Sequence, residues 1–187
     1  MKDCWGGSRT VELKDDDPEV FQAFFGWLYT GKLYSALDAS GKVPLTTKLI
    51  CEVYVFGDAR GAPELCNAAV DLLIQKMQHE WIYPTYQLVF VYENTPPGSP
   101  LRKLLVDDAV QNSSFSELVD LTQRSKGLEL YPKDFLGDVV LAFMALGSTP
   151  IPSSAGYGTL TYGKTNWATY IKPLICSRYH DHPAPPA

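Results

Sequence analysis

Apolar residues recur along most of the chain with the three-to-four-residue spacing of amphipathic helices. The first such segment is 18–30, where Asp17 can cap the helix start, Pro18 suits the first turn and Gly31 can end the helix. Its apolar face is unusually wide, comprising Val20, Phe21, Phe24, Phe25, Trp27, Leu28 and Tyr29. We therefore expect this helix to lie inside the domain with neighbours on two sides. Core packing is favoured over an aromatic ligand-binding box.

Further helices are predicted from about Pro44, from Pro63, from Pro100 and over about Pro132 to Leu146. The first two are separated by a break at Gly57 to Gly61 and should pack antiparallel. The side chains of the last predicted helix that should face inward are Phe135, Leu136, Val139, Val140 and Phe143.

Two short segments have strand character. Thr10 to Leu13 alternates polar and apolar residues, as a half-buried strand does. Tyr86 to Tyr92 is short, apolar and partly β-branched, so strand and helix both stay open. The expected fold is therefore α+β and predominantly helical, with one or two short strands. Residues 148–187 are rich in Gly, Ser, Pro and Tyr and are predicted to form a loosely ordered tail.

Charge and apolar run length exclude several classes of function. The net charge is −5 and the basic residues are scattered, so no patch could neutralise several nucleic-acid phosphates together. No apolar run approaches the length of a membrane span, and the first residues lack the apolar stretch of a signal peptide. We expect an intracellular protein of the cytoplasm or nucleus that binds neither nucleic acid nor membranes.

Cysteine and histidine residues do not predict a metal site. Cys4, Cys51, Cys66 and Cys176 are widely spaced without a C-x-x-C pair, so free and mostly buried thiols are expected. His180 and His182 lie in a proline-rich terminus and are interpreted as part of a solvated tail. No catalytic constellation is visible, and no cofactor is expected.

Two regions of the chain together resemble the domain of one known family. Val11 to Phe21 followed by Phe25-Gly26-Trp27-Leu28-Tyr29-Thr30-Gly31 resembles the strand-then-helix centre of the BTB/POZ family, and Glu52 to Arg60 with Leu65 to Asp71 resembles its later helical pair. Val91 to Thr95, Ser99 to Arg102 and Tyr131 to Phe135 are similar to the helical extension of fungal BTB proteins. The resemblance implies a partial BTB/POZ domain over 1–79, a helical extension over 80–147 and a tail over 148–187.

The chain departs from the family in two places. The family has two strands and a helical hairpin before the segment at Thr10, where this chain has nine residues. Part of Val20, Trp27 and Tyr29 should then stay exposed and promote self-association. Gly7 stands where many family members carry a glutamate that binds cullin scaffolds, so loss of that carboxylate makes cullin binding doubtful.

The resemblance implies a non-enzymatic protein–protein interaction module, acting as an adaptor or scaffold. Its candidate protein-binding residues are Trp5, Trp27 and Tyr29. One alternative is a nucleotide-binding protein, because residues 158–165 fit the P-loop pattern G-x-x-x-x-G-K-[ST], although the prolines around them are unfavourable for the required strand and helix. Another is a truncated product without independent activity.

Overall fold

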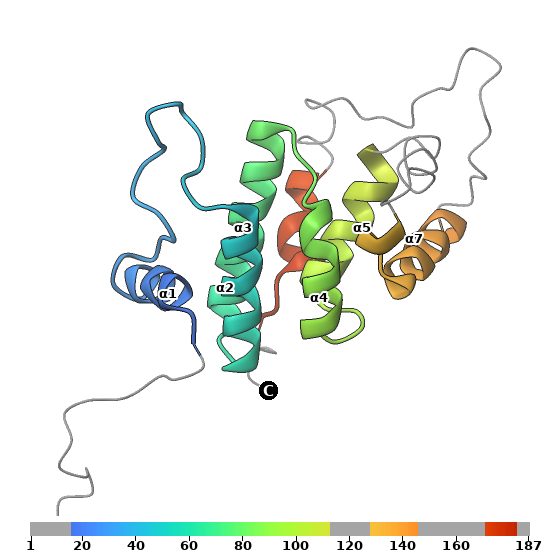
Figure 1. Ribbon diagram of the computed structural model, residues 1–187, viewed down its shortest axis with the longest axis horizontal. Helices are drawn as coiled ribbons and strands as arrows, with labels where there is room; N and C mark the ends of the chain where they lie inside the picture. Colours follow the sequence, from blue (N-terminus) through green and yellow to red (C-terminus); the bar gives the residue numbers. More distant parts are fainter. Residues whose placement is uncertain (1–15, 113–127, 146–170, 183–187) are drawn as a thin grey trace, which may run out of the picture.

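The computed structural model describes residues 16–112, 128–145 and 171–182. Within these ranges the fold is predominantly helical and contains no β-strand (Figure 1). The helical part of the expected α+β fold is confirmed, whereas the strand expected at 10–13 lies outside the described residues. No helix of the described ranges has both the length and the apolarity needed to cross a membrane.

Helix α1, Pro18–Thr30, begins and ends where its local sequence predicts. The Asp17 carboxylate accepts a hydrogen bond of 2.7 Å from the Glu19 amide, and Pro18 occupies the first turn, where an N–H would have no helical partner. Gly31 follows the helix in the left-handed conformation at φ 69°, and its amide donates to the Trp27 carbonyl. Signals within a few residues therefore fix both ends of α1.

Helices α2, Thr47–Ala59, and α3, Pro63–Glu80, form the antiparallel pair at the centre of the fold (Figure 1). Helix α2 starts later than the sequence predicts, because the Thr46 hydroxyl caps it by accepting from the Leu49 amide. Gly57 lies inside α2 and does not break it. A Cβ at Gly57 would lie 2.9 Å from Cys66 Sγ, so the close approach of α3 requires a glycine there.

The segment whose type the sequence leaves open is helical. It comprises the 3₁₀ turn η1, Thr85–Gln87, and helix α4, Leu88–Asn94, which precede α5, Pro100–Asn112. Buried Arg102 joins α4 to α5, because its guanidinium donates to the Tyr92 carbonyl at 2.6 Å and to the Thr95 hydroxyl at 3.0 Å. These acceptors lie at the C-terminal end of α4, where the helix dipole also favours a cation.

The turn η2, Leu128–Leu130, precedes α7, Lys133–Ala145, which packs on α5. Phe135, Val139 and Phe143 are buried, as the sequence predicts. Val140 does not face inward as expected but is 54% exposed. The reason is that α7 is covered along one i, i+4 line, which the three buried residues fill.

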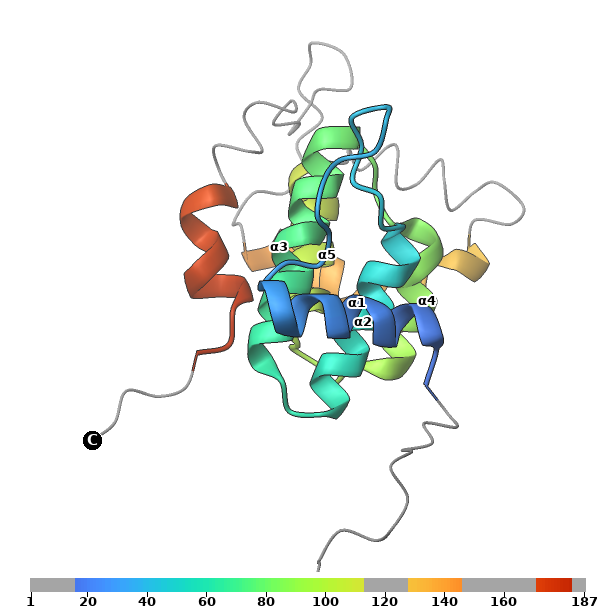
Figure 2. The ribbon, with the colours of Figure 1, turned by 90° about the vertical axis from the view of Figure 1, so that its left-hand side faces the viewer.

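Residues 171–182 pack against helices and do not form the loosely ordered tail that their composition predicts. The turns η3, Lys172–Leu174, and η4, Ile175–Tyr179, lie near α3 and α5 (Figures 1 and 2). Fully buried Tyr179 donates a 2.7 Å hydrogen bond to Asp107, which lies 72 positions earlier in the chain. Residues 148–170 of the predicted tail lie outside the described residues.

Helix α1 lies at one end of the molecule and crosses in front of α2 (Figure 2). It contacts α2 through pairs such as Phe24 and Phe56, whose ring centroids are 5.3 Å apart. Val20 alone among its residues is buried. The expectation of an internal helix with neighbours on two sides is therefore wrong for the described part of the chain, because helices cover one side of α1 only.

Candidate functional site

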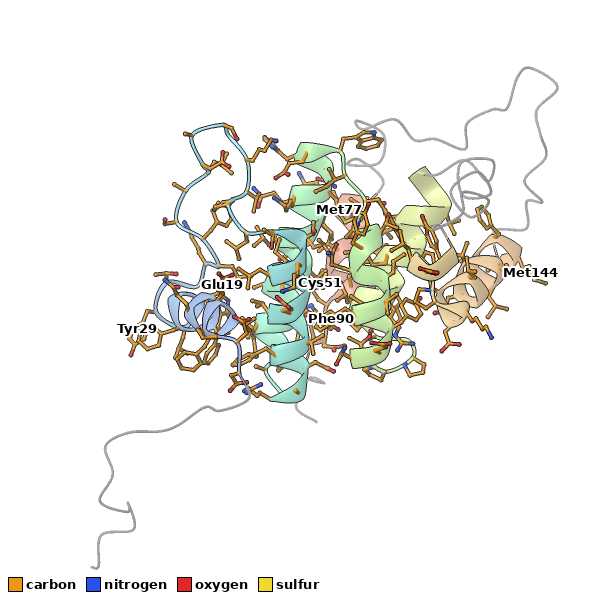
Figure 3. All side chains as sticks on the ribbon, in the orientation of Figure 1. Glu19, Tyr29, Cys51, Met77, Phe90 and Met144 are labelled. Atoms are coloured by element: carbon orange, nitrogen blue, oxygen red, sulfur yellow. The ribbon has the colours of Figure 1, made fainter. Side chains whose placement is uncertain are left out.

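The outer face of α1 carries an aromatic stripe, which we define as Phe25, Leu28 and Tyr29. These side chains are 51%, 58% and 73% exposed. The rings of Phe25 and Tyr29 lie 4.7 Å apart, and Tyr29 points away from the body of the molecule (Figure 3). Since each such side chain has a surface of about 150 to 250 Å², the stripe exposes roughly 300 to 400 Å². Exposed apolar patches of that size are often binding sites.

Gly26 lies on the exposed side of the same helix. A Cβ at this position would meet nothing within 4 Å, so no contact with the described residues requires a glycine here. A glycine inside a helix costs about 0.5 to 1 kcal/mol relative to alanine. The α1 backbone is therefore open to solvent beside Phe25.

The structure places the sequence-predicted interaction residues differently. Tyr29 is on the surface, in the aromatic stripe, whereas Trp27 is half-buried and stacks on Phe24 with a centroid separation of 6.4 Å. Val20, also expected to stay partly exposed, is buried at 4%. Trp5, Gly7 and the P-loop-like residues 158–165 lie outside the described residues.

A second apolar stripe lies on α7 at the opposite end of the molecule (Figure 3). Val140, Leu141 and Met144 are 54%, 65% and 72% exposed there. This stripe has no aromatic member, and exposed Gly137 lies one turn before Val140 and Leu141. It is nevertheless similar enough in exposure to serve as an internal control for the stripe on α1.

A groove of 370 Å³ lies between the segment after α1 and the outer face of α3. Its walls are formed by Gly31 to Ser35 on one side and by Ala68, Asp71, Leu72 and Gln75 on the other. Gln75 donates to the Tyr34 hydroxyl at 3.0 Å, which holds the two walls together. The Asp71 carboxylate belongs both to this groove and to a contact with the C-terminal segment.

A second pocket, of 190 Å³, contains two arginines that are already engaged. Arg102 is used by the α4 carbonyls described above. Arg178 pairs with Asp107 through two N–H groups, and this hydrogen bonding raises the pKa of the guanidinium. Neither charge is free to select an anionic ligand, so the pocket gives no indication of a phosphate site.

The buried thiols are unsuited to chemistry at neutral pH. Burial raises the pKa of Cys51 to about 12 and is also the main cause that raises the pKa of Cys66 to about 12. Cys51, Cys66 and Cys176 are all free, which confirms the expectation of unpaired thiols for the described cysteines. Cys176 differs from the other two because it is exposed.

Cys176 lies close to both C-terminal histidines. One potential ligand atom from each of Cys176, His180 and His182 lies within 4.8 Å of the others, and Cys176 Sγ is 3.0 Å from His182 Nε2. The interpretation as solvated tail is therefore wrong for His180, which is half-buried and contacts Asp71 of α3, whereas His182 is exposed. The spacing C-x₃-H-x-H could have indicated the cluster from the sequence.

Comparisons with protein-family models, curated proteins and solved structures found no match. The resemblance to BTB/POZ domains therefore rests on the segments quoted above.

Proposed function

We propose that this chain is a non-enzymatic protein-interaction module of the BTB/POZ type, and that the aromatic stripe of α1 binds a second copy of the same chain. The observation that supports the proposal is the stripe itself: Phe25, Leu28 and Tyr29 are each more than half exposed on one helix face. Burial of such a surface against another protein stabilises association by roughly 25 cal/mol per Å².

The charges at the two ends of α1 favour a second copy as the partner. Asp17 and Glu19 are exposed at the start of the helix, and Lys32 is exposed just beyond its end. If two copies pair antiparallel about a two-fold axis, the acidic end of one helix faces Lys32 of the other. The two helix dipoles then also run in opposite directions, which is favourable. Parallel pairing would bring like charges together.

The size of the stripe favours weak association. A stable interface buries about 800 Å² on each partner, roughly twice what the stripe offers. The stripe would form the apolar centre of the contact, with the polar ends of α1 at its rim. We expect a dissociation constant in the micromolar range, where expression level decides how much dimer is present.

Sedimentation velocity over a range of chain concentrations tests the proposal. Leu28→Gln should abolish the dimer, whereas Leu141→Gln on α7 should leave it intact. The two leucines are 58% and 65% exposed, so the two variants remove equivalent apolar surface from different ends of the molecule. Circular dichroism of both variants checks that the helices remain folded.

The outcomes distinguish the possible contacts. Loss of association in both variants would indicate a head-to-tail contact between α1 and α7 and would contradict the two-fold dimer. Loss in Leu141→Gln alone would place the contact on α7. A wild-type chain that stays monomeric at high concentration would rule out self-association through α1.

The charge at the rim provides a second test. Lys32→Glu should weaken the dimer several-fold, since it places an acid opposite Asp17 and Glu19 of the partner copy. The effect should shrink as salt is raised, because the Debye length falls from about 10 Å at 0.1 M to about 3 Å at 1 M. Tighter association in Lys32→Glu would contradict antiparallel pairing.

A further inference from the structure

The last described residues of the chain form a ligand cluster that the proposed function does not use. Cys176 is in the π-helical turn η4, and His180 and His182 follow it directly. We infer that Cys176, His180 and His182 bind one zinc ion and that the ion fixes the end of this segment next to α3.

The distances are close to those of a zinc site. Zinc binds sulfur at about 2.3 Å and nitrogen at about 2.0 to 2.1 Å in tetrahedral geometry, which places neighbouring ligand atoms about 3.3 to 3.6 Å apart. The three ligand atoms lie within 4.8 Å of one another, with 3.0 Å between Cys176 Sγ and His182 Nε2. Cys176 and His182 are exposed, so their side chains have room to adjust toward the zinc geometry.

Asp71 is placed to orient one of the ligands. Its carboxylate lies 2.9 Å from His180 Nε2, so it can accept that N–H and leave Nδ1 of the same ring as the metal ligand. Metal-binding histidines very often donate their second nitrogen to a carboxylate or carbonyl, which fixes the tautomer and raises the basicity of the ligand. Asp71 therefore has the role of a positioning residue.

Asn67 holds the backbone between the two histidines. Its side-chain amide donates to the Asp181 carbonyl at 2.9 Å, and its side-chain oxygen accepts from the Asp181 amide at 3.0 Å. Asn67 and Asp71 lie one turn apart on α3, so both anchors of the segment come from one rigid face. The imidazole rings that flank Asp181 are held near each other, with centroids 5.7 Å apart.

The donor set selects the type of metal. A thiolate favours zinc or copper(I), and imidazole suits zinc, whereas calcium and magnesium prefer oxygen ligands. Three protein ligands leave a fourth position for water. Because His180 is tied to Asp71, zinc bound here would also strengthen the contact between residues 176–182 and α3.

The test is zinc titration of the untagged full chain in competition with a chromophoric chelator. One equivalent should bind. Cys176→Ser and His182→Ala should each weaken binding by more than about 100-fold, and Asp71→Asn by about 10- to 100-fold, the usual effect of losing an orienting partner. His79→Ala, which changes the remaining histidine of the chain on α3, should leave the affinity unchanged.

Cobalt(II) gives a spectroscopic readout independent of affinity. The wild-type complex should show the visible absorption of tetrahedral cobalt and a thiolate charge-transfer band. Cys176→His should keep the tetrahedral absorption and lose the charge-transfer band. Affinity should fall as the pH is lowered, because the three ligands bind metal only when deprotonated.

Three results would overturn the inference. One is a wild-type chain that binds no zinc. Another is zinc binding that survives in Cys176→Ser combined with His182→Ala, since the ion would then lie elsewhere. The third is alkylation of Cys176 at a rate that zinc does not change, which would identify Cys176 and His182 as a hydrogen-bonded pair without a metal.

Discussion

Helices α1 and α3 are both rich in apolar residues, but the fold buries them to very different extents. Helix α1 has one buried residue, Val20, whereas α3 has nine. The more uniformly apolar helix is therefore the less buried one. The difference lies in the neighbours: α3 packs against α2, α5 and the C-terminal turns, and α1 packs mainly against α2.

This comparison shows that a wide apolar face does not by itself place a helix in the core. The number of elements that cover an apolar face decides whether that face stabilises the fold or remains available for binding. In α3 every apolar side chain of the stripe finds a partner within the chain. In α1 the stripe of Phe25, Leu28 and Tyr29 does not find one among the described helices.

The largest expected effect comes from truncating a leucine in each helix. Leu73 of α3 is fully buried, so Leu73→Ala should lower the free energy of unfolding by about 2 to 5 kcal/mol. Leu28→Ala on the exposed face of α1 should change it by less than about 0.5 kcal/mol. Urea denaturation at low chain concentration measures both. Equal losses would show that α1 is as covered as α3.

A methyl group added to Gly57 tests the close packing between α2 and α3. Its Cβ would lie 2.9 Å from Cys66 Sγ and 3.3 Å from a Leu65 methyl carbon, so Gly57→Ala should destabilise the α2–α3 pair by about 1 to 3 kcal/mol. Gly137→Ala on α7 is the matched control, because nothing lies within 4 Å of its Cβ. A neutral Gly57→Ala would mean that the two helices can separate without loss.

Phe24 tests the boundary between the buried and exposed sides of α1. The sequence predicts a core aromatic whose truncation costs about 3 to 5 kcal/mol. The structure shows Phe24 half-buried against Phe56, so Phe24→Ala should cost about 1 to 2.5 kcal/mol. Thermal denaturation of Phe24→Ala and Phe24→Leu measures the loss, and Phe24→Leu should retain most of the stability.

Gly26→Ala has the smallest expected effect on the stability of the monomer, and the sign of that effect is informative. Gly26→Ala should stabilise the monomer by about 0.5 to 1 kcal/mol, because the helix gains a better former and the Cβ meets open space. The same change should weaken self-association, since the added methyl group lies on the contact face. Gly137→Ala should stabilise similarly without affecting association. Loss of stability in Gly26→Ala would show that the open space is occupied in solution.

Much of the helical framework could be predicted because its signals are local. Asp17 and Gly31 delimit α1, and Pro63 and Pro100 open α3 and α5. The predicted start of α2, about Pro44, is too early, because nothing in the sequence distinguishes the capping hydroxyl of Thr46 from other nearby polar groups. Periodicity also cannot show that Val140 faces solvent, since that depends on how much of α7 is covered.

The candidate sites depended on contacts between distant residues, and these have no local signal. Exposure of Tyr29 and partial burial of Trp27 follow from where α2 lies. His180 contacts Asp71, which lies 109 positions earlier in the chain. The ligand spacing at Cys176, His180 and His182 was visible in the sequence, but its significance follows from the packing that holds the segment in place.

The two hydrogen bonds between the Asn67 side chain and the Asp181 backbone also have a consequence for the order of folding. Helices α2 and α3 are joined by three residues and can pair early, whereas these hydrogen bonds join residues 114 positions apart. Closing a loop of that length costs about 2 kcal/mol more than closing one of about ten residues. The C-terminal turns should therefore dock last, after the helices that receive them have formed. Until that step the Asn67 and Asp71 side chains face water, so pulsed amide exchange during refolding should find the Asp181 amide, which donates to the Asn67 side chain, protected later than the amides of α2 and α3.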